Sequence, residues 1–181
     1  MCYRMKTKPI MEEEIERRNY NNNLQSFIEK LKGSFMELIS FNIDTDPTFD
    51  KHNIPFKFEY CFSIRITTDK TNFDIQTSLT DSGMETFWAT QSSENNLYSS
   101  QIKVGEKVKN VEFSNGIDNY AFKIKIECEN AKFIIYAAEI YDTVSEDFDY
   151  KINDEMLLLF DNEKDTEIFE KIISVQKNGN T

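Results

Sequence analysis

The chain has 181 residues, a formal net charge of −11, three cysteines and one histidine. That length suits a single domain with a substantial core. An odd number of cysteines without a C-x-x-C pair disfavours a disulfide framework and a zinc site, and a single histidine excludes most histidine-based catalysis. No secretory signal is visible and no apolar run approaches the length of a membrane span, so we expect a cytoplasmic protein with no membrane partner and no cofactor.

The first predicted element is a short helix over about residues 23–32. Asn23 is placed to cap its start, and Gly33 is placed to end it. Residues 1–22 hold a run of charges and then a cluster of asparagines, so we expect a poorly ordered leader there. Apolar residues recur through the helix at the spacing of one buried face, at Leu24, Phe27, Ile28 and Leu31.

After this helix the hydrophobic period changes to two, which indicates β-strands. One strand is expected over residues 35–43, and residues 73–79 are expected to form a hairpin with the strand before them. The clearest alternation runs from residue 56 to residue 67, with Cys61 on its polar side. The apolar side, which we expect to face the core, carries Phe56, Phe58, Tyr60, Phe62, Ile64 and Ile66.

The remaining pattern completes an α+β fold. Residues 132–141 are apolar on both faces, which predicts a central strand covered on both sides, and Asn162 is placed to cap a terminal helix over about 163–174. We predict one mainly antiparallel sheet of about seven or eight strands with a short N-terminal helix and a C-terminal helix, as a single domain over 23–175 with a flexible tail over 176–181. Other strands are expected over 85–91, 107–113, 120–128 and 150–160.

No motif for nucleotide binding, zinc proteolysis or serine hydrolysis occurs, so no catalytic or metal-binding residue is predicted. Glu139 is the unusual residue, because it interrupts the apolar strand over 132–141. A carboxylate in a covered strand must be paired, hydrogen-bonded or protonated. Arg65, equally isolated on its own strand, is one conceivable partner; the other interpretations are a structural ion pair elsewhere, or a strand end that emerges into solvent.

Most of the negative charge lies in one stretch, from Glu139 to Glu170. It holds twelve carboxylates against Lys151 and Lys164, a net charge of −10. Apolar residues run through its middle, so it is not a disordered tail. A folded acidic face favours a basic protein as partner, whereas a chain with a pI near 4.6 would repel nucleic acid.

The end of the chain also resembles a known group of proteins. The segments over 136–142 and 150–161, followed by a short acidic helix, are similar to the C-terminal parts of small acidic bacterial proteins. Some of these resemble the immunity proteins of polymorphic toxin systems. The resemblance covers the C-terminal third of the chain, and it implies neutralisation of a cognate toxin without identifying contact residues.

We therefore predict a non-enzymatic interaction protein, an immunity-type inhibitor that occludes a basic toxin such as a nuclease. Carboxylates would speed association, and aromatic residues among them would anchor the partner. One alternative is a sheet that binds a small molecule or catalyses a reaction with Glu139 and Arg65; another is a mimic of nucleic-acid phosphates. The predicted partner-binding residues are Tyr141, Asp142, Glu146, Asp147, Phe148, Asp149, Tyr150, Asp154 and Glu155.

Overall fold

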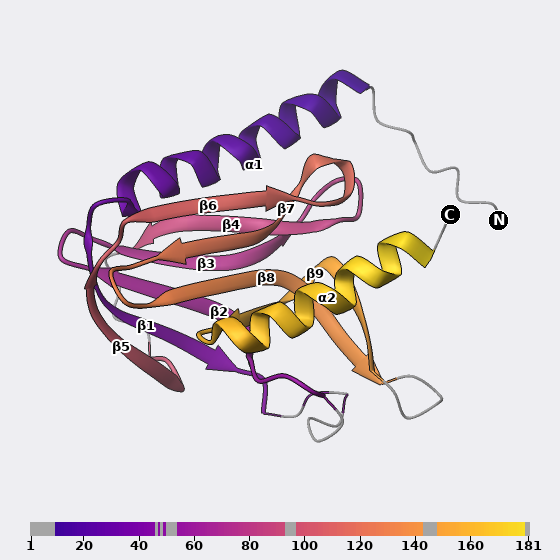
Figure 1. The fold of residues 1–181 in the computed structure, drawn as a ribbon. Helices are drawn as coiled ribbons and strands as arrows, with labels where there is room; N and C mark the ends of the chain where they lie inside the picture. The colour runs from indigo at the N-terminus through magenta and orange to yellow at the C-terminus, as the bar shows by residue number, and fades with distance from the viewer. Residues whose placement is uncertain are drawn as a thin grey trace.

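The computed structural model describes residues 10–45, 47, 49, 54–92, 97–142 and 148–179. Helices α1 (Ile10–Leu31) and α2 (Glu163–Gly179) flank one nine-stranded antiparallel sheet, which confirms the predicted α+β class (Figure 1). A short 3-10 turn, η2 (Ile117–Asn119), precedes the seventh strand. The strands are β1 (Phe35–Ile43), β2 (Glu59–Thr68), β3 (Asn72–Leu79), β4 (Glu85–Ser92), β5 (Ser100–Lys107), β6 (Asn110–Asn115), β7 (Ala121–Glu127), β8 (Lys132–Asp142) and β9 (Phe148–Phe160).

The sheet curls around one core and carries a second core on its outer side. Its main path runs β4-β3-β2-β9-β8-β7-β6, and β1 pairs with both β2 and β5. Helix α1 packs along β4 and β6, and it contributes Leu24, Phe27 and Leu31 to the inner core (Figure 1). Helix α2 packs on the outer face and contributes Phe169 and Ile173 to the second core. Since β8 supplies residues to both cores in alternation, the prediction of a central strand covered on both sides is confirmed.

Helix α1 begins at Ile10 rather than at residue 23. Residues 10–22 are therefore helical and not the poorly ordered leader that was predicted over 1–22. Residues 1–9 lie outside the described part of the chain. Polar contacts with distant turns dock this first half of the helix. The carboxylate of Glu16 accepts the backbone N–H of Asp81 at 2.9 Å, and the Arg17 guanidinium donates to the carbonyl of Asp118 at 3.1 Å. Asn23 is therefore an interior helical residue and not a cap.

At the other end of the chain, the Asn162 cap is confirmed, because its side-chain oxygen accepts the backbone N–H of Lys164 at 2.9 Å. Helix α2 then continues to Gly179, beyond the predicted end at residue 174. Glutamine and lysine near its end favour helix. Most of the tail predicted over 176–181 is thus helical backbone, and residues 180 and 181 lie outside the described part.

A bulge in β2 corrects the predicted alternation of that strand. The pairing of β2 with β1 shifts between Ser63 and Cys61, so Phe62 has no opposite residue. The two sides of the strand exchange faces at this point. Cys61 is fully buried in the inner core, Tyr60 points to the second core, and Phe62 is 55% exposed.

Strand β9 carries a larger irregularity, over residues 153–156. Ala137 of β8 pairs with Leu157, whereas the next residue, Ala138, pairs with Ile152, so the residues between them bulge out of the ladder. Asn153 has a φ of 57° there and is 2% exposed. Its amide nitrogen donates to the carbonyls of Glu85 at 3.0 Å and Ala121 at 3.1 Å. One side chain of β9 thereby ties β4 to β7, and β4 is the end of the main sheet path.

Candidate functional site

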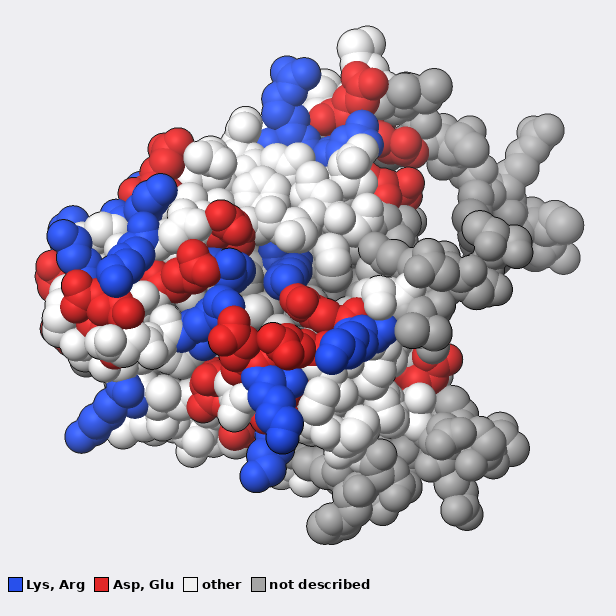
Figure 2. All heavy atoms as spheres, viewed as in Figure 1, with Lys and Arg blue, Asp and Glu red and all other residues white. Residues whose placement is uncertain are grey.

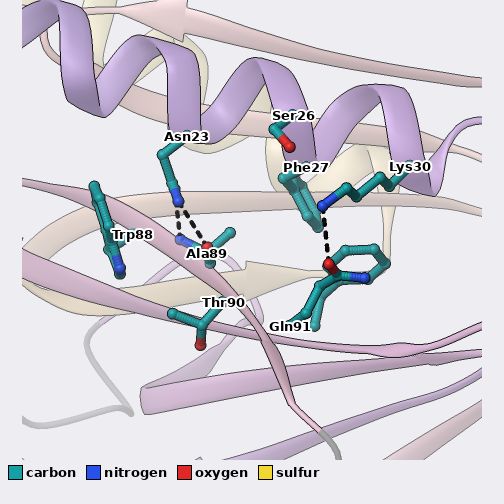
Figure 3. A pocket seen from close by; sticks show the side chains of 9 residues that line it. Asn23, Ser26, Phe27, Lys30, Trp88, Ala89, Thr90 and Gln91 are labelled. Atoms are coloured by element: carbon teal, nitrogen blue, oxygen red, sulfur yellow. Dashed lines mark hydrogen bonds between the residues drawn. The ribbon is translucent and has the colours of Figure 1, made fainter.

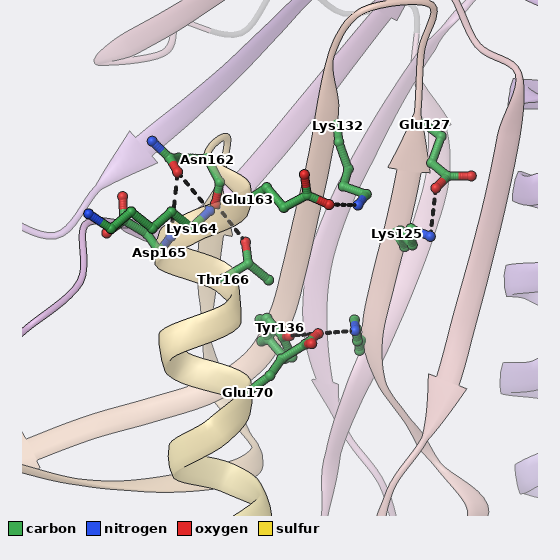
Figure 4. A network of polar contacts seen from close by, with 11 residues as sticks. Lys125, Glu127, Lys132, Tyr136, Asn162, Glu163, Lys164, Asp165, Thr166 and Glu170 are labelled. Atoms are coloured by element: carbon green, nitrogen blue, oxygen red, sulfur yellow. Dashed lines mark hydrogen bonds and ion pairs between the residues drawn. The ribbon is translucent and has the colours of Figure 1, made fainter.

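Two of the four acidic residues of α2 form ion pairs with lysines of the sheet. Glu163 forms an ion pair with Lys132 at 2.5 Å, and Glu170 forms one with Lys123 (Figure 4). The hydroxyl of Tyr136 also donates to Glu170 at 2.9 Å. Figure 2 accordingly shows lysines and carboxylates intermixed on this side of the molecule. This part of the acidic stretch therefore serves to attach the helix to β7 and β8.

The hairpin formed by β8 and β9 presents a different kind of surface. Glu139 lies opposite Lys151, and Tyr141 lies opposite Asp149, so these four residues share one face of the hairpin. Figure 1 shows this end of the hairpin projecting beyond the neighbouring strands. We refer to Glu139, Tyr141, Asp149 and Lys151, with the nearby Glu85, Asp154 and Glu155, as the hairpin face.

Carboxylates outnumber the one lysine on the hairpin face, and the pKa values of two of them, Glu139 and Glu85, are raised. The pKa of Glu139 is raised first by burial and then by the charges of Asp154 and Glu155, against the attraction of Lys151. Glu85 has a raised pKa for the same reasons. Asp154 is nearly buried and forms an ion pair with Lys151. Lys151 therefore attracts the acids around it, but for Glu139 and Glu85 burial and the neighbouring negative charges outweigh that attraction.

The predicted partner-binding residues divide into three sets. Tyr141, 36% exposed, and Glu155, also exposed, lie where a partner would reach them, and Asp149 is partly exposed. Phe148 and Tyr150 are also partly exposed, but they pack toward the second core, with ring centroids 5.7 Å from Phe56 and Phe169 respectively, and Asp154 is nearly buried. Glu146, Asp147 and the side chain of Asp142 lie outside the described residues.

Arg65 does not form an ion pair with Glu139; its partner is Asp74. Its guanidinium makes two hydrogen bonds to the carboxylate of Asp74, at 2.6 and 2.7 Å, and the hydroxyl of Tyr98 donates to the same carboxylate at 2.9 Å. The charges that act on Glu139 come instead from β9. The expectation of an Arg65 partner for Glu139 is wrong, because the register of β2 and β3 places Asp74 directly opposite Arg65.

Sequence reasoning missed Glu85 and Lys151 as members of this surface. Lys151 stands three residues before Asp154, a spacing that was visible in the sequence. Glu85 had no such signal, because it is brought to the hairpin by the bulge of β9 and the Asn153 contact. Within the described part of the chain, no group of three His, Cys, Asp or Glu residues is arranged to hold a metal ion.

No family model, curated protein or solved structure matches the chain. Neither helix, over the residues described, combines the length and the apolar character needed to cross a bilayer.

Replacing Glu139 with glutamine is expected to raise the free energy of unfolding at neutral pH by about 0.5 kcal/mol, the scale of partly screened charge interactions. Because the folded pKa of Glu139 is raised, its protonated form stabilises the fold at low pH, and that stabilisation is lost as the pH rises through the folded pKa. The gain of the variant should therefore vanish below about pH 4. Urea unfolding at neutral and acidic pH measures this, with the exposed Glu129→Gln as control; a destabilised Glu139→Gln at neutral pH would contradict the expectation.

Proposed function

We propose that the protein is a non-enzymatic interaction module that binds a basic partner protein through the hairpin face. The observation that supports this most is the contrast between two sets of acids. Glu163 and Glu170 of α2 are paired with lysines of the sheet. On the hairpin face, by contrast, the pKa values of Glu85 and Glu139 are raised, first by burial and then by the charges of Asp154 and Glu155. A cationic surface would relieve that repulsion, so the binding energy has a physical source.

The hairpin face combines two features of fast and lasting association. Its net negative charge attracts a basic surface during diffusion, which raises the association rate at low salt. Tyr141 supplies a large, partly exposed ring among the acids, and a tyrosine buried at an interface slows dissociation. We expect charge variants to change mainly the association rate and Tyr141→Ala to change mainly the dissociation rate.

The kind of partner proposed is a basic toxin, such as a nuclease, which this protein would occlude in the manner of an immunity protein. The resemblance of the C-terminal third to immunity-type proteins supports this choice. We place the protein in the cytoplasm, which the buried free thiols of Cys61 and Cys128 suit.

The decisive experiment compares two double variants of equal charge. Asp149→Lys with Glu155→Lys reverses two carboxylates on the hairpin face, while Glu129→Lys with Asp161→Lys reverses two exposed carboxylates at the opposite end of β8 and β9. Immobilised wild type and both variants are used to capture proteins from a lysate of the source organism at low and high salt. We expect the wild type and the control variant to capture a basic protein at low salt and to lose it at high salt. The hairpin variant should not capture it.

The captured protein is then measured against each purified variant. The hairpin reversals should reduce the association rate at low salt by at least about tenfold and leave the unfolding temperature nearly unchanged. Toxicity of the captured protein on expression alone, relieved by co-expression of wild type and not by the hairpin variant, supports the toxin-inhibitor role. Equal capture by all three proteins would refute the hairpin face as the binding site.

A further inference from the structure

A second site lies away from the hairpin face, between α1 and the edge strand β4. Here the surface encloses a pocket of about 360 Å³ (Figure 3). Small-molecule sites typically range from about 300 to 1,000 Å³ and combine an apolar lining with a few converging polar groups. The pocket is therefore large enough for a ligand with one or two rings.

The pocket exists because side chains hold α1 beside β4 at two points. The amide of Asn23 donates to the carbonyl of Ala89 and accepts its backbone N–H, both at 2.9 Å. About two helical turns further along the same face, Lys30 donates to the side-chain oxygen of Gln91 at 2.8 Å. Figure 3 shows these two bridges on either side of Phe27. The pocket is therefore the space between α1 and β4 that these two hydrogen-bonded contacts leave open.

The lining is aromatic on the inside. Phe27 and Phe73 are both buried and meet edge to face, with ring centroids 5.2 Å apart. Trp88 lines the pocket on the other side of the Asn23–Ala89 bridge, is partly buried, and packs against Tyr20 at a centroid distance of 5.3 Å (Figure 3). Phe27 and Phe73 thus form a closed apolar floor, and Trp88 is the ring of the three that a planar ligand can contact.

The polar groups of the pocket favour an anion. Among its nine lining residues, Lys30 is the one charged side chain, and no carboxylate lines it, although the chain carries a formal charge of −11. Over the part of the chain that the structure describes, the hydroxyl of Ser26 and the indole N–H of Trp88 make no hydrogen bond within the protein. The pocket thus offers one ammonium and two donors to a ligand and no competing negative charge.

We propose that this pocket binds a small aromatic carboxylate. The ring of the ligand lies against Trp88 and over the apolar floor formed by Phe27 and Phe73, and its carboxylate replaces the amide oxygen of Gln91 as the acceptor for Lys30. Ser26 is placed to donate a further hydrogen bond. This site is independent of the partner-binding role proposed for the hairpin face.

Trp88 makes the test direct, because it is the one tryptophan of the chain and lines the pocket. The purified full-length protein is titrated with phenylacetate, whose ring does not absorb at the excitation wavelength of tryptophan, and binding is followed by Trp88 fluorescence and by calorimetry. We expect saturable binding of phenylacetate and at least about tenfold weaker binding of the neutral phenylacetamide. The variant Lys30→Gln, which removes the charge from an exposed side chain, should weaken phenylacetate about tenfold.

The matched control is Lys32→Gln, which removes an equally exposed charge just beyond α1 from a residue that does not line the pocket. This control should bind phenylacetate as the wild type does. Three results would overturn the proposal: no saturable signal with phenylacetate at millimolar concentrations, equal binding of phenylacetamide, or an equal loss in both lysine variants. Displacement of phenylacetate by inorganic phosphate at concentrations no higher than those of phenylacetate itself would also overturn it, because the aromatic lining would then add no affinity.

Discussion

Replacing Asn153 with alanine is expected to lower the free energy of unfolding by about 3 kcal/mol. The change removes the amide that bonds the carbonyls of Glu85 and Ala121, so the carbonyl of Glu85 loses this donor. Ala121 keeps the hydroxyl of Thr86, at 3.0 Å. Alanine must also adopt the φ of 57° that asparagine tolerates. Urea unfolding followed by circular dichroism measures the loss.

Glycine at the same position separates the two causes. Asn153→Gly also removes the amide, but glycine adopts a positive φ without strain, so this variant should be about 1 kcal/mol more stable than Asn153→Ala. If both variants unfolded within about 0.5 kcal/mol of wild type, the link that Asn153 makes between β4 and β7 would have no energetic weight.

Replacing Asp74 with alanine is expected to cost about 3 kcal/mol, because it leaves the buried guanidinium of Arg65 without its carboxylate. Burial alone would raise the pKa of Asp74, but hydrogen bonds from Arg65 and Tyr98 outweigh it and lower that pKa. The carboxylate therefore stabilises the fold above its unfolded pKa, and this contribution is lost as the pH falls through the lower folded pKa. The difference between variant and wild type should be constant above about pH 5 and shrink in stronger acid.

A double variant tests whether the cost comes from removing the Asp74 carboxylate from the buried Arg65 guanidinium. Arg65→Met with Asp74→Leu removes both charges and keeps apolar volume, so it should recover most of the stability lost in Asp74→Ala. Thermal and urea unfolding of the single and double variants at neutral pH provide the comparison. A double variant as unstable as the single one would show that packing or the Tyr98 contact, and not the loss of the Asp74 carboxylate from Arg65, sets the cost.

The parts of the fold that sequence reasoning predicted are those set by local pattern. The double-sided apolar run of β8 and the Asn162 cap of α2 each follow from neighbouring residues alone. The bulge at Phe62 was hidden, because apolar residues stand on both sides of it and the alternation looks unbroken. The first half of α1 was missed because Glu16 and Arg17 dock it through partners more than 60 residues away, which no window of sequence can reveal.

The candidate site was predicted in outline and not in detail. Counting charges identified the acidic stretch but could not separate the acids of α2 from those of the hairpin face. Lys123 and Glu170 stand 47 positions apart, and their contact depends on how α2 lies across β7. The same holds for Arg65, whose partner is fixed by the register of the β2–β3 hairpin rather than by its isolation in the sequence.

The contact between Asn23 and Ala89 has a consequence for how the protein behaves in a crowded solution. Strand β4 ends the main path of the sheet, and an edge strand can recruit a strand from another molecule. By bonding both backbone groups of Ala89, the amide of Asn23 occupies the place that an intruding strand would take. Helix α1 thus covers part of the β4 edge. We expect that detachment of α1 would expose this edge to pairing with another molecule even while the sheet stays folded.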